Sequence, residues 1–377
     1  MKIIITVNTY YPLKDGVQFV TQYHAENLAL RGHNVIVFTT NHGNDSEEIH
    51  NGVKIIRFNV VNKHTFYSGE KEKYLQSLKK ELKDADVMIN VCTQHPLTDW
   101  CFPIFDSINC RKILYMHGMY DKSFNSKTIA NISDLGHKIW NNIRWGLYYK
   151  KNKKIFKKYD KIIQLHKFDT GYIHFKKKYN IDSSIIENAV DDRFFDFCKD
   201  GEKYAISVAN YMPRKNQEFI LKAFYMSHID KNFKLILIGS KENAYYHKIM
   251  KLKEELEEKY GQKNVEILFN VEREKTINLI KKASVYLLGS KWEAFPISII
   301  EAMAARIPYI STDVGIVKYL PGGVIVKNED EMSYWIETLV SDDKLSEYMG
   351  AVGNQYAKKH MMIEKKVDDL ETIIKGD

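Results

Sequence analysis

The sequence is poor in the residues that mark disulfide frameworks, metal sites and membrane spans. Its four cysteines form no C-x-x-C pair and lack the histidine spacing of a zinc site, so we interpret them as free thiols in a reducing compartment. No stretch approaches the roughly 18 apolar residues that a transmembrane helix needs. Residues 1–7 are too short for the apolar core of a signal peptide and run directly into a strand pattern. We therefore expect a cytoplasmic protein.

A dinucleotide-binding glycine run is also missing. A dehydrogenase of doubly wound fold needs G-x-G-x-x-G after its first strand, and residues 8–16 contain no such run. The sequence thus argues against a nicotinamide-dependent oxidoreductase.

The chain does have length, apolar residues and positive charge. Its 377 residues suit about two domains, and an apolar fraction of 44% supports buried cores. The net charge is +8. Such a balance suits nucleic acid, an anionic membrane surface or anionic small molecules, and composition alone does not choose among them. No known nucleic-acid-binding motif accompanies the charge, so we expect no nucleic-acid partner.

Short β-branched runs alternate with amphipathic segments over nearly the whole chain. The runs are continuously apolar, which suits parallel strands covered by helices on both faces. Two such series predict an α/β protein with two doubly wound domains. The expected strands are 2–8, 34–39, 87–91, 112–116, 161–165, 204–209, 234–239, 265–269, 284–289, 308–311 and 323–326. The expected helices are 17–31, 217–227, 241–260, 273–283 and 297–306.

A polar and charged stretch at 188–200 indicates the boundary between the domains. We predict an N-terminal domain over residues 1–190 and a C-terminal domain over 191–355. A charged helix pattern follows at about 356–377, and we expect it to pack back on the first domain.

In open parallel sheets, ligands bind outside the carboxyl ends of the strands, so the loops after the strands are the candidate sites. Strand 204–209 leads into Arg214 and Lys215, directly before a helix. Two cations at a helix N-terminus favour a bound diphosphate. A solvated basic turn explains the same two residues equally well.

The loop after strand 284–289 carries Glu293, and Glu301 follows eight residues later in a helix. A loop carboxylate can accept hydrogen bonds from sugar hydroxyls, and a helix carboxylate can accept them from a ribose. The alternative for Glu301 is a capping box with Ser298, in which it only closes the helix start. Pro296 favours an earlier start, because proline prefers the first helical position. Both interpretations remain open from these residues.

A longer series of motifs resembles one known family. Almost the whole chain is similar to the retaining glycosyltransferase family 4, the group 1 glycosyltransferases of the GT-B fold. The resemblance rests on these segments: Tyr11-Pro12 with Gly16-Val17, Leu28-x-x-Arg31-Gly32-His33-x-Val35, Tyr115-Met116-His117-Gly118, Ile186-Glu187-Asn188-Ala189-Val190-Asp191, Pro213-Arg214-Lys215-Asn216, and the E-x7-E motif from Glu293-Ala294-Phe295-Pro296 to Glu301-Ala302-Met303.

The resemblance implies a GT-B architecture, in which an acceptor-side N-terminal domain and a donor-binding C-terminal domain face each other across a cleft. The implied reaction is the retaining transfer of a hexose from a nucleoside-diphosphate sugar of UDP or GDP type. The implied acceptor is a glycan or a lipid-linked glycan of bacterial surface polysaccharide or glycolipid synthesis. No cofactor and no metal are implied.

The resemblance also assigns roles to individual residues. Glu293 would hold the donor sugar and Glu301 the ribose, with Arg214 and Lys215 binding the diphosphate and stabilising the leaving group. The implied nucleotide-sugar site continues through three further residues, Phe295, Pro296 and Ile297.

Two residues of the first domain have implied roles as well. At Gly16 the backbone would approach the phosphates, because glycine lets main chain come close. His117 stands where the family has its active-site histidine. A lone buried histidine is otherwise more often structural.

Several positions depart from the family pattern and put donor identity in doubt. Asp15 replaces a common glycine next to the expected phosphates, and Asn210 replaces a frequent arginine. Four more usual glycine positions are occupied by Ala189, Asn216, Ala294 and Arg306. Asp84-Ala85-Asp86 resembles the D-x-D metal motif of another glycosyltransferase fold. It lies where a helix meets a strand, so we interpret it as a solvated helix end.

The stretch 138–161 is basic and aromatic, with Trp140, Trp145, Tyr148 and Tyr149 among many lysines. Such a helix could lie on an anionic leaflet at the inner face of a membrane, or it could cover a sheet face with its lysines solvated. Two other functions share the expected fold. One is a non-catalytic sugar-nucleotide-binding subunit, and the other is a GT-B epimerase or phosphorylase, which lacks the E-x7-E spacing.

Overall fold

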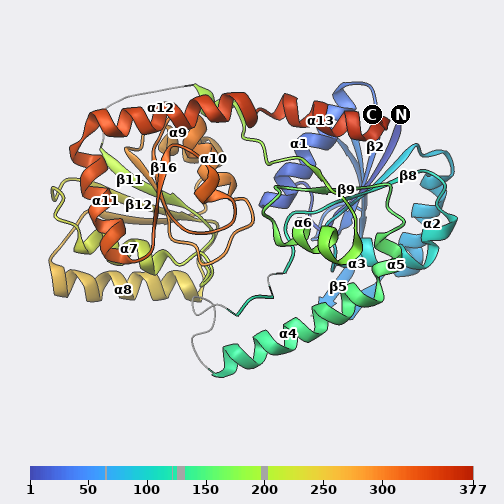
Figure 1. Ribbon diagram of the computed structural model, residues 1–377, viewed down its shortest axis with the longest axis horizontal. Helices are drawn as coiled ribbons and strands as arrows, with labels where there is room; N and C mark the ends of the chain where they lie inside the picture. Colours follow the sequence, from blue (N-terminus) through green and yellow to red (C-terminus); the bar gives the residue numbers. More distant parts are fainter. Residues whose placement is uncertain (64–65, 121, 125–131, 197–202, 377) are drawn as a thin grey trace. The chain divides into compact units, whose positions relative to one another are not determined.

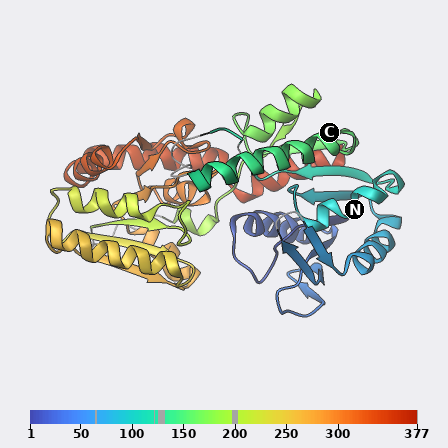
Figure 2. The ribbon, with the colours of Figure 1, turned by 90° about the horizontal axis from the view of Figure 1, so that it is seen from below.

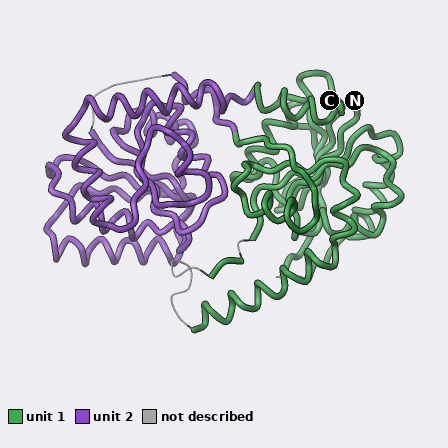
Figure 3. Tube along the Cα trace, viewed as in Figure 1, with its two compact units in different colours: residues 1–188, 364–377 green, residues 189–363 purple. Residues whose placement is uncertain are grey.

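Buried β-branched runs form the strands of two separate parallel sheets. The computed structural model describes residues 1–63, 66–120, 122–124, 132–196 and 203–376. The chain divides into unit 1, residues 1–188 with 364–377, and unit 2, residues 189–363 (Figure 3). This division differs by two residues from the predicted boundary at 190.

Unit 1 contains an eight-stranded sheet in the order β10-β9-β8-β7-β1-β2-β4-β3 (Figure 1). All neighbours are parallel except β3, which runs antiparallel to β4. Its strands are β1 (Lys2–Thr6), β2 (Asn34–Thr40), β3 (Glu47–His50), β4 (Val53–Phe58), β7 (Val87–Val91), β8 (Arg111–Tyr115), β9 (Lys161–Gln164) and β10 (Ser184–Ile185). A separate antiparallel pair consists of β5 (Val60–Lys63) and β6 (Phe66–Gly69).

Helices cover both faces of this sheet. Successive residues of each strand point to opposite sides, so the apolar strands place side chains against the helices of both faces. Ile5 packs with Val20 of α1 and Leu370 of α13 on one face. Ile4 belongs to the core of the other face, together with Tyr74 of α2. The helices of this unit are α1 (Gly16–Leu30), α2 (Lys71–Glu81), α3 (Pro96–Asp99), α4 (Ile132–Lys151), α5 (Lys153–Phe156), α6 (Thr170–His174) and α13 (Ile363–Lys375).

Unit 2 contains a six-stranded parallel sheet in the order β13-β12-β11-β14-β15-β16. Helices α7 and α8 lie together on one side of it (Figures 1 and 2), and α9 and α10 lie on the other (Figure 1). The strands are β11 (Tyr204–Val208), β12 (Lys234–Gly239), β13 (Val265–Phe269), β14 (Val285–Leu288), β15 (Tyr309–Thr312) and β16 (Gly323–Val326). The helices are α7 (Gln217–Met226), α8 (Ala244–Tyr260), α9 (Arg273–Lys281), α10 (Ile297–Ala304), α11 (Glu329–Ser341) and α12 (Asp343–His360).

Each sheet has a topological switch point, where the strand order reverses. In unit 1 it lies between β1 and β7, and in unit 2 between β11 and β14. Loops leave these neighbouring strands in opposite directions, which opens a crevice at their carboxyl ends. The loops after β11 and β14 are those that carry Arg214, Lys215 and Glu293.

The predicted C-terminal helix is wrong in one respect. The charged pattern at 356–377 is two helices, because α12 ends at His360 and α13 begins at Ile363. Between them, Met362 pairs with Val190 in an isolated parallel bridge. Residues 356–363 therefore lie in unit 2, and the part of the chain that packs on unit 1 starts at Glu364.

The cysteines are free thiols as far as the structure describes them, at Cys92, Cys101 and Cys110. Cys198 lies outside the described residues, as does the charged end of the predicted boundary stretch at 197–200.

Candidate active site

The two loops at the switch point of unit 2 touch each other through their backbones. The Lys291 amide donates to the Arg214 carbonyl at 2.8 Å, and the Asn216 side chain donates to the Gly289 carbonyl at 3.1 Å. A Cβ on Gly289 would lie 2.9 Å from the Asn216 oxygen, closer than real Cβ contacts. Glycine at the end of β14 thus lets the loops approach each other.

This approach brings Lys215 and Glu293 together. The Lys215 ammonium lies 2.6 Å from Glu293 Oε1, and the Ser290 hydroxyl donates to the same oxygen at 2.7 Å. The Glu293 side chain is only 8% exposed and that of Lys215 18%. Burial of either charge alone would be costly, so the pair is stabilised by its own contact. Both hydrogen bonds within the described residues end on Oε1, which leaves Oε2 to accept from a ligand.

Arg214 is exposed beside this pair. Its guanidinium lies 5.3 Å from the centre of the Trp292 ring, within cation–π distance. Trp292 belongs to the loop after β14, so this contact also links the two loops. A guanidinium that stacks on a ring still has its N–H donors available for an anion.

The departure from glycine at Asn216 has a conformational explanation. Asn216 precedes α7 in the left-handed region, with φ 53° and ψ 46°. Asparagine is among the few non-glycine residues that adopt this region readily. Arg306 also replaces a usual glycine and has φ 62°, but arginine has no such preference. The left-handed backbone is therefore retained at both positions.

Glu301 does not cap α10. The helix begins at Ile297, so Glu301 is its fifth residue, and Ser298 lies inside the helix. The capping-box interpretation is therefore wrong. The expected position of Pro296 is also off by one residue, because Pro296 is the residue before the helix and not its first residue. Phe295 and Pro296 are buried beside Glu293 in the sequence, and Ile297 is half-buried.

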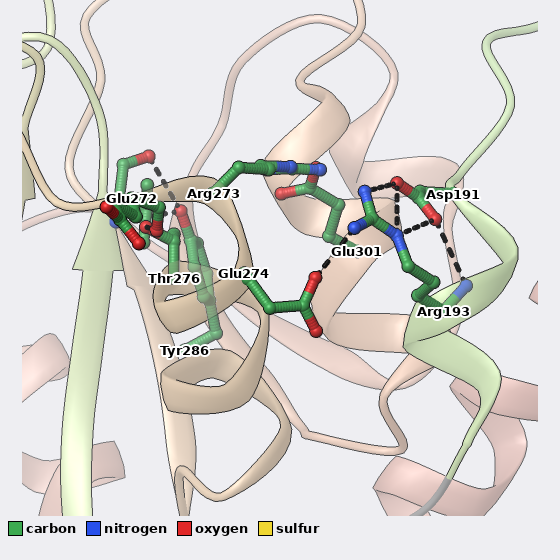
Figure 4. A network of polar contacts seen from close by, with 9 residues as sticks. Asp191, Arg193, Glu272, Arg273, Glu274, Thr276, Tyr286 and Glu301 are labelled. Carbon is green, nitrogen blue, oxygen red and sulfur yellow. Dashed lines mark hydrogen bonds and ion pairs between the residues drawn. The ribbon is translucent and has the colours of Figure 1, made fainter.

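Glu301 is instead paired with Arg273, the first residue of α9. Arg273 Nη2 lies 2.5 Å from Glu301 Oε1, and the Glu301 side chain is 6% exposed. Figure 4 shows the two side chains close together, with Asp191, Arg193 and Glu274 beside them.

Gly16 begins α1 at the switch point of unit 1, and Asp15 is its N-cap. The Asp15 carboxylate accepts from the Gln18 amide at 2.9 Å and from the Thr9 hydroxyl at 2.6 Å. Aspartate is a preferred N-cap because it satisfies helix amides that otherwise lack partners. The unexpected carboxylate beside Gly16 therefore has a structural role.

His117 follows β8, the neighbour of β7, and stacks on Tyr115 with ring centres 4.7 Å apart. Burial lowers the pKa of His117 to about 3, so the ring is neutral at physiological pH. Its Nε2 is buried and makes no hydrogen bond within the described part of the chain. A buried polar atom without a partner is unusual in proteins and is compatible with a ligand contact.

Asp84 and Asp86 lie at the opposite edge of the unit 1 sheet, away from the carboxyl ends of the strands. The Lys2 side chain donates to Asp84 at 2.6 Å, and the Lys2 amide donates to Asp86 at 2.7 Å. Lys2 is the first residue of β1. Both carboxylates are therefore engaged by the amino end of the sheet.

The basic aromatic stretch is helical, but most of its aromatic rings point inward. Trp145 and Tyr149 of α4 are buried, and Tyr148 donates to Asp99 at 2.6 Å. Of the four aromatic residues singled out in the sequence, only Trp140, 61% exposed, faces outward. An exposed apolar face consists of Ile132, Leu135, Ile139, Trp140, Ile143 and Leu147. None of the helices in the described part of the chain is long and apolar enough to cross a membrane.

The structure thus brings together Lys215 and Glu293, and places Arg214 at their side. Ser290 and Arg273 were not predicted from the sequence. Both follow strands, Ser290 after β14 and Arg273 at the start of the helix after β13. The rule that ligands gather at carboxyl ends could have included them, but serine and arginine are common there.

Comparison with known proteins adds family information. Residues 191–365 match the family "Glycosyl transferases group 1", which covers nearly all of unit 2. A 186-residue part of the chain is 28% identical to the O-antigen chain mannosyltransferase RfbU of Salmonella typhimurium. The match covers 48% of this chain and 51% of that protein, so the chain spans about half the length of the curated relatives it matches.

Solved structures resemble the whole chain at low identity. Sucrose-phosphate synthase from Thermosynechococcus elongatus superposes with a TM-score of 0.76 at 15% identity, covering 99% of this chain and 98% of that one. HepE of Anabaena, solved in complex with UDP, gives 0.72 at 13% identity and covers 100% of both chains. The predicted GT-B fold, with two doubly wound α/β domains, is confirmed.

Proposed function

We propose, from the match of residues 191–365 to the group 1 glycosyltransferases, that the protein is a retaining, metal-independent glycosyltransferase of family 4. Its donor is a nucleoside-diphosphate sugar of UDP or GDP type. Its acceptor is a glycan or a lipid-linked glycan in the synthesis of a surface polysaccharide or glycolipid.

The observation that carries this proposal is the contact of Lys215 with Glu293 at the switch point of unit 2. One group suits a diphosphate and the other a sugar hydroxyl, and a nucleotide sugar offers both within one molecule. Lys215 and Arg214 stabilise the negative charge that develops on the departing nucleoside diphosphate. Glu293 Oε2 accepts from the donor sugar, which orients its anomeric carbon.

Three further residues complete the proposed assignment. Glu301 accepts hydrogen bonds from the ribose, and the backbone at Gly16 contacts the phosphates. His117, neutral because burial lowers its pKa, hydrogen-bonds the reacting sugar. Support for the donor class comes from HepE, which was solved with UDP, and support for the acceptor class from RfbU, which is described as an O-antigen mannosyltransferase.

Thermal unfolding with a panel of nucleoside diphosphates and their sugars tests the proposal. Ligands that bind only the folded state raise the unfolding temperature by mass action. The sugar that stabilises most is then incubated with candidate acceptors, and the anomeric configuration of the product is determined. Retained configuration supports the proposal. Binding without transfer or hydrolysis favours a non-catalytic subunit, and an altered free sugar nucleotide favours an epimerase.

The lipid-linked acceptor leads us to propose that α4 docks on an anionic membrane surface from the cytoplasmic side. Its exposed apolar face repeats at the spacing of one helical side. Lys150 and Lys151 at its end, and Lys153 and Lys154 in the following α5, are exposed. Apolar side chains enter the interface while the lysines meet anionic headgroups, each contributing about 1 kcal/mol.

Vesicle sedimentation tests the docking. Binding to anionic but not neutral vesicles is expected, and it weakens as salt rises. Replacement of Lys150, Lys151, Lys153 and Lys154 with glutamate abolishes it. A matched variant replaces four exposed lysines of unit 2 with glutamate, which alters the net charge by the same amount. These lysines are Lys231, Lys251, Lys259 and Lys282. Equal loss in both variants would point to net charge alone and not to α4.

A further inference from the structure

Arg273 is fixed on two sides next to the carboxylate of Glu301 (Figure 4). Its guanidinium carbon lies 5.2 Å from the centre of the Phe194 ring, and its Nη2 lies 2.5 Å from Glu301 Oε1. Phe194 is completely buried. It belongs to a short helical turn, Asp192–Phe195, and so reaches Arg273 from a part of unit 2 that is separate from both α9 and α10.

No other described cation forms an ion pair with Glu301. The neighbouring Arg193 is engaged by Asp191 at 2.6 Å and by Glu274 at 2.7 Å. Among the described residues, Arg273 alone therefore offsets the cost of burying this carboxylate. Because a guanidinium does not lose its proton at any physiological pH, the partner stays charged throughout.

The contact also fixes which oxygen is available. Arg273 binds Oε1, and no hydrogen bond within the described residues reaches Oε2. A glutamate side chain normally rotates about its last bond, so a free carboxylate presents its oxygens in many directions. Held by Arg273, Glu301 presents one defined oxygen to a ligand.

We propose that Arg273 is a positioning residue that holds Glu301 for the ribose hydroxyls and thereby sets a preference for ribonucleotides over 2′-deoxyribonucleotides. This inference rests on the proposed function, in which Glu301 accepts from ribose. An acceptor oxygen in a fixed position binds the 2′-hydroxyl of a ribonucleotide, and a 2′-deoxyribonucleotide lacks this hydrogen bond. A rotating carboxylate compensates for its absence by turning to the 3′-hydroxyl, and so discriminates less.

The test measures dissociation constants of UDP, GDP and their 2′-deoxy forms by calorimetry. The unmodified protein is expected to prefer the ribonucleotide of its cognate base by about tenfold or more, the size of one hydrogen bond to a charged group. Arg273→Gln reduces this ratio to about two, mainly by weakening the ribonucleotide. Arg273→Lys restores part of the ratio, because an ammonium also pairs with Oε1 but lacks the planar contact with Phe194.

Arg193→Gln is the matched control, because it removes a neighbouring guanidinium that does not contact Glu301. It is expected to leave the ratio unchanged. Unfolding temperatures of all variants are measured alongside. Equal weakening of ribo and deoxy forms in Arg273→Gln, or an unchanged ratio, would overturn the positioning role while leaving the glycosyltransferase proposal intact. Failure of the unmodified protein to bind any nucleotide would overturn both.

Discussion

The carboxyl edges of the two sheets share a topology but differ in charge. In unit 2 the loops at the switch point hold a buried ion pair, Lys215 with Glu293, and an exposed Arg214. In unit 1 burial raises the pKa of the Cys92 thiol to about 12 and lowers that of His117 to about 3. Both groups are therefore neutral at physiological pH.

This difference agrees with the proposed function, in which the two edges contact different parts of the substrates. Fixed charges suit an anionic diphosphate, whereas neutral hydrogen-bonding groups suit uncharged hydroxyls. Unit 1 also holds strained backbone at this edge, because Cys92 and Gln94 have φ of 64° and 69°. Strain of this kind costs about 1–3 kcal/mol and gathers at functional sites.

The largest effect is expected for Glu293→Gln. An amide loses the charge-assisted bond to the donor sugar and leaves Lys215 without its partner, so kcat/KM falls by about 100-fold. Nucleoside diphosphate affinity changes little, because Lys215 is then free to bind phosphate. Steady-state kinetics and calorimetry measure the two quantities. Glu329→Gln, on α11, serves as control, and a loss of affinity as large as the loss of kcat/KM would contradict the assignment.

Glu301→Gln should weaken nucleotide binding by about tenfold while leaving the fold intact. The amide still accepts from ribose, but without the strength of a charged acceptor. Thermal stability and nucleotide affinity are measured on the same samples. If stability drops sharply while affinity is retained, Glu301 has only a structural role in pairing with Arg273.

Asp99 extends the contrast, because the neutral surroundings of unit 1 disfavour its charge as well. Burial raises the pKa of Asp99 to about 7, although Tyr148 and Tyr67 donate to it. The folded-state pKa lies above the unfolded value, so the stability that the protonated group contributes is lost as pH rises through 7. The free energy of unfolding of Asp99→Asn, relative to that of the unmodified protein, should therefore increase by about 1 kcal/mol from pH 6 to pH 8. Urea unfolding at both values measures this, and an equal difference at the two pH values would refute the assignment.

The smallest expected effect is that of chelation. Arg214 and Lys215 supply the positive charge of the unit 2 edge, and the D-x-D pattern of unit 1 is engaged by Lys2. Turnover in EDTA should therefore stay within about twofold of its value with magnesium, since electrostatic stabilisation comes from side chains. Activity abolished by EDTA and restored by manganese would reverse this prediction. Partial stimulation by a metal would not, because metals can ease product release.

Much of the fold was predictable because parallel strands have a strong local signal. Four of the expected strands, 87–91, 234–239, 265–269 and 323–326, have the predicted bounds. Short edge elements were missed, among them β3 and the pair β5 and β6. Such strands are exposed and alternate in polarity over few residues, so their pattern is weak.

The candidate site was likewise predictable only in part. Residue type and position near the loops after strands made Arg214, Lys215, Glu293 and Glu301 candidates, because chain direction in a parallel sheet determines which loops share an edge. The E-x7-E spacing did not reveal how Glu301 is used locally, since the start of α10 decides whether that residue caps the helix. Pro296 indicated the start to within one residue.

Local sequence patterns specify two α/β units and the loops that carry charge, and residues 191–365 match the group 1 glycosyltransferases. The partners of the site residues depend on the three-dimensional packing: Glu293 with Lys215 and Ser290, Glu301 with Arg273, and the inward side of α4 with Asp99. The reason is the distance along the chain over which each kind of interaction acts. Periodicity and turn chemistry act over a few residues, whereas these pairs join segments 28 to 78 residues apart, apart from Ser290.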